Sequence, residues 1–179
     1  HRMDTLSPLH IAAEVGNTLL YKFILERSEE KNPSVEQWRF DCEFDEEWTP
    51  ILAAARNGHL DTCLAIMESL AVINPSNTEG FTPLHAAAAG GHLQICRAIL
   101  EKLKNQHPTV FNPEDEFKIT PLHWAARKGH IEVCKALLDV AWDKNPADHS
   151  DRTVLHYAAK EGHAEICKMI MCLIDDLNP

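Results

Sequence analysis

Histidine–cysteine pairs are the side chains of this 179-residue chain whose types and spacing come closest to metal chemistry. In each pair the histidine precedes the cysteine by four residues, as in His59/Cys63, His92/Cys96, His130/Cys134 and His163/Cys167. Residues four apart share one face of a helix, so a pair could offer an imidazole and a thiolate to one ion. A tetrahedral zinc site needs four ligands, and packed helices lie about 8–10 Å apart, which leaves the next pair too distant. We therefore predict buried structural thiols and no metal site.

Catalytic sequence patterns are missing from the chain. It contains no Gly-x-Ser-x-Gly, no P-loop, no dinucleotide-binding glycine motif and no clustered carboxylate pair beside a base. Only His1, His107 and His149 of the 11 histidines lie outside a repeating motif, and these three are far apart in sequence. We predict no catalytic residues, no cofactor and a protein that is not an enzyme.

Five copies of the repeating motif position the other histidines, and we number the units one to five by their motif starts at Ser7, Thr49, Thr82, Thr120 and Thr153. The third copy reads TPLHAAAAGGH. A Ser or Thr N-cap followed by proline predicts the start of a first helix, and the later glycine predicts its end in a left-handed turn. A second helix then carries the cysteine on its buried stripe. An Asn-Pro pair closes each unit, and we expect it to stop the second helix, because the residue before proline disfavours helix.

The pattern Thr-Pro-Leu-His-x-Ala-Ala…Gly-His resembles the signature of the ankyrin repeat, whose period is about 33 residues. The resemblance runs from about residue 4 to the last residue. It implies an all-α fold, an ankyrin-repeat solenoid of stacked helix-turn-helix units joined by extended β-turn or hairpin-like loops. We expect a single domain over 1–179, with repeats at about 4–33, 44–75, 77–113, 115–146 and 148–179 and insertions within 33–48 and 102–111.

Composition narrows the class of partner. There are 17 Lys and Arg against 27 Asp and Glu, a formal net charge of −10, so the chain repels phosphate backbones and we predict no nucleic-acid binding. No apolar run reaches the roughly 18 residues of a membrane helix, so we predict no direct membrane insertion. The six cysteines form no compact disulfide pattern, which indicates a reducing compartment, cytoplasmic or nuclear.

The last helix is strongly apolar, and this bears on the end of the array. A free-standing solenoid needs polar outer faces on its terminal units. The sequence around Ile170 and Ile174 lacks them, so we expect these two side chains on an open end face and the chain to be a piece of a longer array. The alternative is that both ends are merely adequate caps.

The resemblance also implies where a partner would bind, on the concave face formed by the inner side of the first helices and by the loops between units, which we call fingers. Cations occupy this face in units two, four and five, whereas the fingers carry acids, Glu79, Glu114, Asp115 and Glu116 among them. Residues just before each motif, or inside it, add aromatic groups, and aromatics beside arginine are typical of binding hot spots. The candidate partner-binding residues are Trp48, Arg56, Phe81, Phe117, Ile119, Trp124, Arg127, Lys128, Arg152, Tyr157 and Lys160.

Two alternatives stay open at these positions. The aromatic residues could pack on neighbouring fingers instead of contacting a ligand, and the charges could be ordinary solvated ones. The insertion within 33–48 could be a docking finger for a basic partner or a loop folded onto units one and two. The function predicted is a non-catalytic protein–protein recognition module for a protein or peptide of mixed charge. The alternative function is a regulatory array cut from a larger enzyme or membrane channel; oligomeric state is not predicted.

Overall fold

Ten helices in five pairs make up the fold of the computed structural model, which describes residues 7–28, 48–70, 72–106 and 112–177. In chain order they are α1 (Pro8–Val15), α2 (Thr18–Leu25), α3 (Pro50–Arg56), α4 (Leu60–Ser69), α5 (Pro83–Gly90), α6 (Leu93–Gln106), α7 (Pro121–Lys128), α8 (Ile131–Val140), α9 (Val154–Lys160) and α10 (Ala164–Leu177). Within those ranges β structure is limited to an isolated bridge between Ala147 and Thr153 and a bridge residue at Trp48. The predicted all-α architecture is confirmed.

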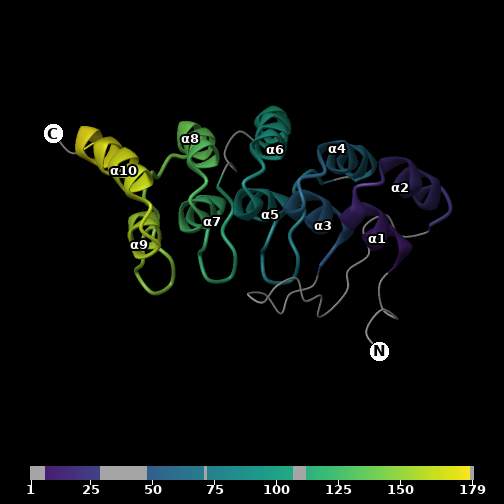
Figure 1. The fold of residues 1–179 in the computed structure, drawn as a ribbon, viewed down its shortest axis with the longest axis horizontal. Helices are drawn as coiled ribbons and strands as arrows, with labels where there is room; N and C mark the ends of the chain where they lie inside the picture. Colours follow the sequence, from purple (N-terminus) through teal and green to yellow (C-terminus); the bar gives the residue numbers. More distant parts are fainter. Residues whose placement is uncertain (1–6, 29–47, 71, 107–111, 178–179) are drawn as a thin grey trace.

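The helices form two layers (Figure 1). Each first helix packs against its own second helix and against the first helix of the next unit, as in the series α1, α3, α5, α7 and α9. The second helices line up in the other layer, and the fingers extend from the first-helix layer on the side away from them. This is the stacked solenoid that the motif predicts.

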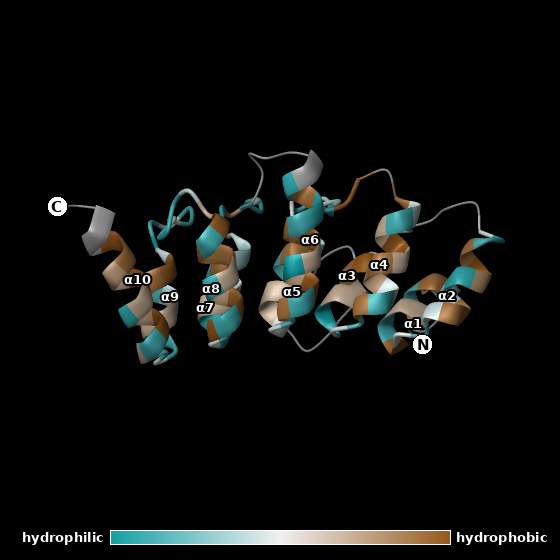
Figure 2. Ribbon diagram, turned by 90° about the horizontal axis from the view of Figure 1, so that it is seen from above, coloured by the Kyte–Doolittle hydropathy of each residue, from teal (hydrophilic) through white to brown (hydrophobic). Residues whose placement is uncertain are grey.

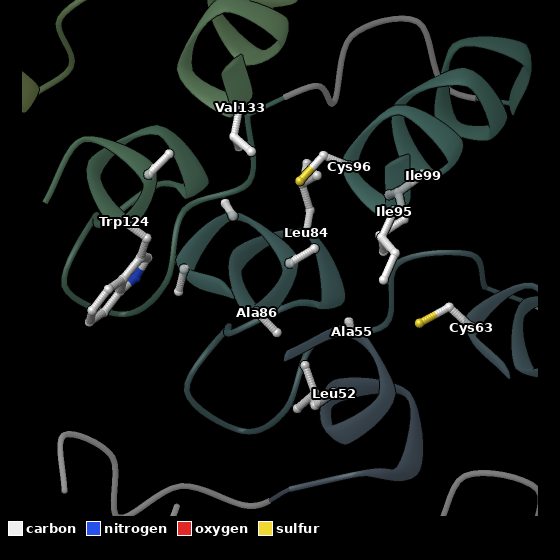
Figure 3. Close-up of a cluster of buried hydrophobic side chains, with 14 of the residues drawn as sticks. Leu52, Ala55, Cys63, Leu84, Ala86, Ile95, Cys96, Ile99, Trp124 and Val133 are labelled. Carbon is white, nitrogen blue, oxygen red and sulfur yellow. The ribbon is translucent and has the colours of Figure 1, made fainter. Parts of the chain in front are cut away.

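Small side chains allow the first helices to pack closely. Ala54, Ala87 and Ala125 have no exposed surface, and the second helices add a branched apolar stripe such as Ile95 and Ile99 in unit three (Figure 3). The in-phase cysteines lie on that same stripe. Cys63, Cys96 and Cys134 are at most 1% exposed and Cys167 is half-buried, so the prediction of buried thiols is confirmed for the first three.

Glycine ends the first helices as predicted, with Gly16, Gly91 and Gly129 in the left-handed region at φ 74°, 76° and 78°. The prediction for the Asn-Pro pairs is wrong for α4 and α8, whereas α10 runs to Leu177, the residue before Asn178. The helices α4 and α8 end at Ser69 and Val140, five residues before their Asn-Pro pairs.

The asparagine of the pair has a different task, which is to cap the next unit. Asn74 accepts a hydrogen bond from the backbone N–H of Leu84 at 3.1 Å, and Asn145 accepts one from Leu155 at 3.0 Å. These donors lie in the first turns of α5 and α9, where backbone N–H groups have no partner inside the helix. The pair therefore links the end of one unit to the start of the next.

Two further expectations meet the structure only in part. The insertion within 102–111 lengthens α6, which runs to Gln106, and its remaining residues lie outside the described ranges, as do residues 33–47 of the first insertion. The expectation that Ile170 lies on an open end face is wrong, because its side chain is fully buried in the core. Ile174 is half-buried, and the neighbouring Met171 is the residue that is 50% exposed.

Candidate functional site

The histidines that follow each helix-ending glycine bind the preceding unit. The Nε2 of His59 donates to the Glu14 carbonyl at 2.7 Å, and the rings of His92, His130 and His163 donate to the Arg56, Ala89 and Arg127 carbonyls at 2.8, 3.2 and 3.1 Å. Each ring also covers the glycine of the preceding unit; a methyl group on Gly16 would lie 2.4 Å from the His59 ring. The imidazoles are therefore structural links. In the described part of the chain no three His, Cys, Asp or Glu side chains are grouped closely enough to hold a metal ion.

Two of the histidines inside the motif, His10 and His85, bind the following unit instead. The Nδ1 of His85 accepts hydrogen bonds from the Thr82 backbone N–H at 3.1 Å and from the Thr82 hydroxyl at 2.9 Å, while its Nε2 donates to the Ile119 carbonyl at 3.0 Å. The His10 ring reaches the Trp48 carbonyl in the same way at 3.1 Å. Burial lowers the pKa of His85 to about 3 and that of His123 to about 4, so both rings are neutral near pH 7.

The three buried thiols, Cys63, Cys96 and Cys134, have no reactive character. Burial raises the pKa of Cys63, Cys96 and Cys134 to about 12, which keeps them protonated near neutral pH. A protonated, buried thiol is neither a nucleophile nor a metal ligand. The histidine–cysteine pairs are thus two separate parts of the scaffold, a link between units and a core residue.

Three of the candidate aromatic residues pack inside the scaffold. Trp48, Phe81 and Trp124 are 3%, 1% and 5% exposed. Their rings form a ladder between units, with centroid separations of 6.3 Å from Trp48 to Phe81 and 6.2 Å from Phe81 to Trp124. Of the two alternatives, packing accounts for these three residues, because so little of each ring is open to a partner.

The turn of each finger is held by an Asn or Asp at one repeated position, which the sequence analysis did not identify. Asn77, Asp115 and Asp148 each lie five residues before a motif threonine, and each accepts two backbone N–H hydrogen bonds across its own turn at 2.8–3.1 Å. Adjacent fingers are joined by backbone hydrogen bonds, from Glu116 N–H to Glu79 at 2.8 Å and from His149 N–H to Phe117 at 3.0 Å. The recurring Asn or Asp at this position was the available signal. The carboxylate of Asp115 therefore holds the turn and is not a free fingertip charge.

In unit five, the same turn residue also organises side chains. Asp148 is 4% exposed and accepts hydrogen bonds from the Arg152 guanidinium at 2.8 and 2.9 Å and from the Tyr157 hydroxyl at 2.7 Å. Burial alone would raise the pKa of Asp148, but these bonds and two backbone N–H groups hold it well below its usual range. The Arg152 guanidinium lies 5.4 Å from the Tyr157 ring, so Asp148 fixes a cation against an aromatic face.

The candidate residues that keep solvent-accessible surface are concentrated in units four and five. Phe117 is 53% exposed and the Arg152 side chain 56% exposed; Lys128 and Lys160 are exposed, and Ile119, Arg127 and Tyr157 are half-buried. The Arg127 guanidinium lies 5.3 Å from the Trp124 ring. Burial raises the pKa of Tyr157 to about 12, against the smaller lowering effect of the Arg127 charge. Arg56, in unit two, is half-buried and lies two units away along the chain from this group. The exposed acids Glu114, Glu116 and Asp151 lie on the adjoining fingers.

Comparison with known proteins gives one finding about the whole chain. A family model described as ankyrin repeats in three copies matches residues 9–112 and 103–178. No curated protein matches the chain significantly. Among the helices of the described residues, none is both long enough and apolar enough to cross a membrane.

Proposed function

The chain belongs to the ankyrin repeat family, whose repeats generally mediate protein–protein interactions, and from this premise we propose that it is a non-catalytic module that binds a protein or peptide on the concave side of units four and five. We call the proposed contact the unit four–five surface and define it by Phe117, Ile119, Arg127, Lys128, Arg152, Tyr157 and Lys160. Arg56 extends it toward unit two.

The observation that carries the proposal is the fixed arrangement of several cations and aromatic rings in units four and five. Arg152 and Tyr157 are held by Asp148, and Arg127 lies against Trp124. Side chains that are already ordered lose little conformational entropy on binding, and arginine and tyrosine are enriched where interfaces gain most of their affinity. Unit one has one exposed cation–aromatic pair, Arg27 over the Phe23 ring at 3.9 Å, but this pair belongs to the end of α2, in the second-helix layer.

The charges indicate the chemistry of the partner. The cations of α7 and α9 suit carboxylates, and the acids of the fingers suit a partner's basic residues, so we expect a peptide segment of mixed charge. A net charge of −10 disfavours nucleic acid.

A displayed library of random peptides, selected on the wild-type protein, tests the proposal. Selected peptides should contain Asp or Glu, and their binding should weaken at least tenfold with Arg127→Glu/Lys128→Glu. The control Lys102→Glu/Lys104→Glu makes the same change of net charge on α6, in the second-helix layer, and should leave binding within about twofold. Selected peptides whose binding ignores the first pair, or falls equally with both pairs, would contradict the proposed surface.

A further inference from the structure

The outer side of unit five is exposed at positions whose equivalents in the earlier units are buried by the next unit. Ala159 is exposed, whereas its counterparts six residues after each earlier motif start are 0% exposed in Ala13, Ala55, Ala88 and Ala126. His156 is also exposed, whereas the residues at its position are at most 1% exposed in His10, Leu52, His85 and His123. The first helix of unit five thus presents the same small and histidine side chains on which a next unit packs elsewhere.

The second helix of unit five shows the same difference. Met171 is 50% exposed, and its counterparts Met67, Leu100 and Leu138 are 3%, 7% and 3% exposed. Among the described residues α10 is the outermost second helix at this end of the array, and its ribbon carries hydrophobic segments (Figure 2). Met171 and half-buried Cys167 lie four residues apart, on one face of α10.

The backbone groups that link units are in place as well. Gly162 has the left-handed φ of 79° and nothing within 4 Å of the position a Cβ would take. At the equivalent Gly129 that position is 2.6 Å from the His163 ring. Two residues earlier, the Lys160 carbonyl occupies the place of the Arg127 carbonyl, which accepts the His163 hydrogen bond.

The His156 ring is oriented like its buried counterparts. Its Nδ1 accepts from the Thr153 backbone N–H at 3.1 Å and from the Thr153 hydroxyl at 2.9 Å, the same distances found for Thr82 and His85. In His85 this orientation directs Nε2 to a carbonyl of the next unit's finger. The ring of His156 is therefore ready to make that bond.

We propose that the outer face of unit five, formed by Leu155, His156, Ala159, Gly162, Cys167 and Met171, is a docking face for one further ankyrin-type unit of the same array. The argument is continuity with an established interface, since the face supplies a hydrophobic surface, an imidazole donor and a carbonyl acceptor in the register used between units three and four. The inference is independent of the unit four–five surface.

A second copy of this chain fits the face less well. Its exposed first unit would have to present an imidazole to the Lys160 carbonyl, but unit one has Asn17 where the other units have histidine. The Asn17 side chain already caps α2 by accepting from the Leu20 N–H at 3.0 Å. A unit that carries Gly-His supplies the missing ring.

The test adds such a unit. A copy of residues 147–179 appended after Pro179 recreates the junction between Pro146 and Ala147 and brings its own Gly-His histidine. We expect one cooperative thermal transition, with a Tm about 5 °C or more above that of the five-unit chain. A separate lower transition for the added unit, or an unchanged Tm, would overturn the proposal.

Two measurements make the result specific. Gly162→Ala should lower the Tm more in the six-unit chain than in the five-unit chain, because only the former has a ring for the new methyl to meet; equal shifts would contradict docking in the repeat register. Sedimentation of the five-unit chain should show a monomer. A dimer that Met171→Glu dissociates would assign the face to a second copy and overturn the occupant proposed here.

Discussion

The finger side of the molecule differs between its two halves. In units two and three, Trp48 and Phe81 occupy the positions just before the motif and are buried in the ring ladder. In unit five the same position is Arg152, whose side chain is 56% exposed and tied to Asp148. One position in the repeat therefore packs in the scaffold in the first half and leaves a charged side chain exposed to solvent in the second. The position of a residue within the repeat therefore does not by itself predict whether its side chain is buried or exposed.

The largest effect should come from comparing two phenylalanines on neighbouring fingers. Phe81→Ala removes a ring that is 1% exposed and should lower the free energy of unfolding by about 3–5 kcal/mol. Phe117→Ala removes a ring that is 53% exposed and should lower it by about 0.5 kcal/mol or less. Urea denaturation measures both. Losses of similar size would remove the distinction between the buried and the exposed half.

Acid should destabilise the folded protein through its buried histidines, His85 and His123. The pKa of His85 is about 3 and that of His123 about 4 in the folded protein, below the ordinary histidine value of about 6.5. The unfolded chain therefore binds more protons, and stability present above about pH 6.5 is lost as the pH falls toward 4, by about 2 kcal/mol for each histidine. Denaturation midpoints between pH 7 and 4.5 measure this.

Two matched histidine variants test whether the buried rings cause this loss of stability in acid. His85→Gln should flatten the pH dependence, whereas His156→Gln, at the equivalent but exposed position, should leave its slope nearly unchanged. An equal slope in both variants and the wild type would show that other groups govern the acid response.

Two substitutions of Asp148 should distinguish its role as a hydrogen-bond acceptor in the turn from the role of its negative charge. Asp148→Ala removes the acceptor of two backbone N–H groups and should cost about 2 kcal/mol. Asp148→Asn keeps an acceptor oxygen, as Asn77 does in unit three, and should cost clearly less while weakening the hold on Arg152. Thermal unfolding ranks the two variants; an equal cost would mean that the charge, and not the turn, holds this finger.

The smallest effect concerns two strained fingertips. Lys118 and Asp151 both adopt φ 58°, a region that glycine occupies without strain, as Gly80 does at φ 81°. Lys118→Gly and Asp151→Gly should each raise the free energy of unfolding by about 0.5 kcal/mol. A loss of stability in chemical denaturation would show that these side chains make stabilising contacts.

The sequence predicted what the repeat enforces. Ser/Thr-Pro starts, glycine turns and in-phase cysteines each follow from local backbone chemistry, and the structure has them where the motif placed them. When most residues of a helix are apolar, as in α10, hydrophobicity alone does not predict which side of the helix is buried. The sequence therefore places Ile170 on the open face, which Met171 occupies in the structure. Nor could it separate buried from exposed aromatics: Trp124 lies edge-on to Phe81, a contact across units that no local pattern encodes. The role of Asp148 depends on the spatial approach of Arg152 and Tyr157.

An NMR titration of the labelled protein with its tightest selected peptide tests the central claim most directly. We predict that backbone and side-chain signals of Arg127, Lys128, Arg152 and Tyr157 shift in a saturable manner, while signals of α2, α4 and α6 stay unchanged. Shifts confined to the second-helix layer, or to residues 33–47, would contradict recognition by the unit four–five surface.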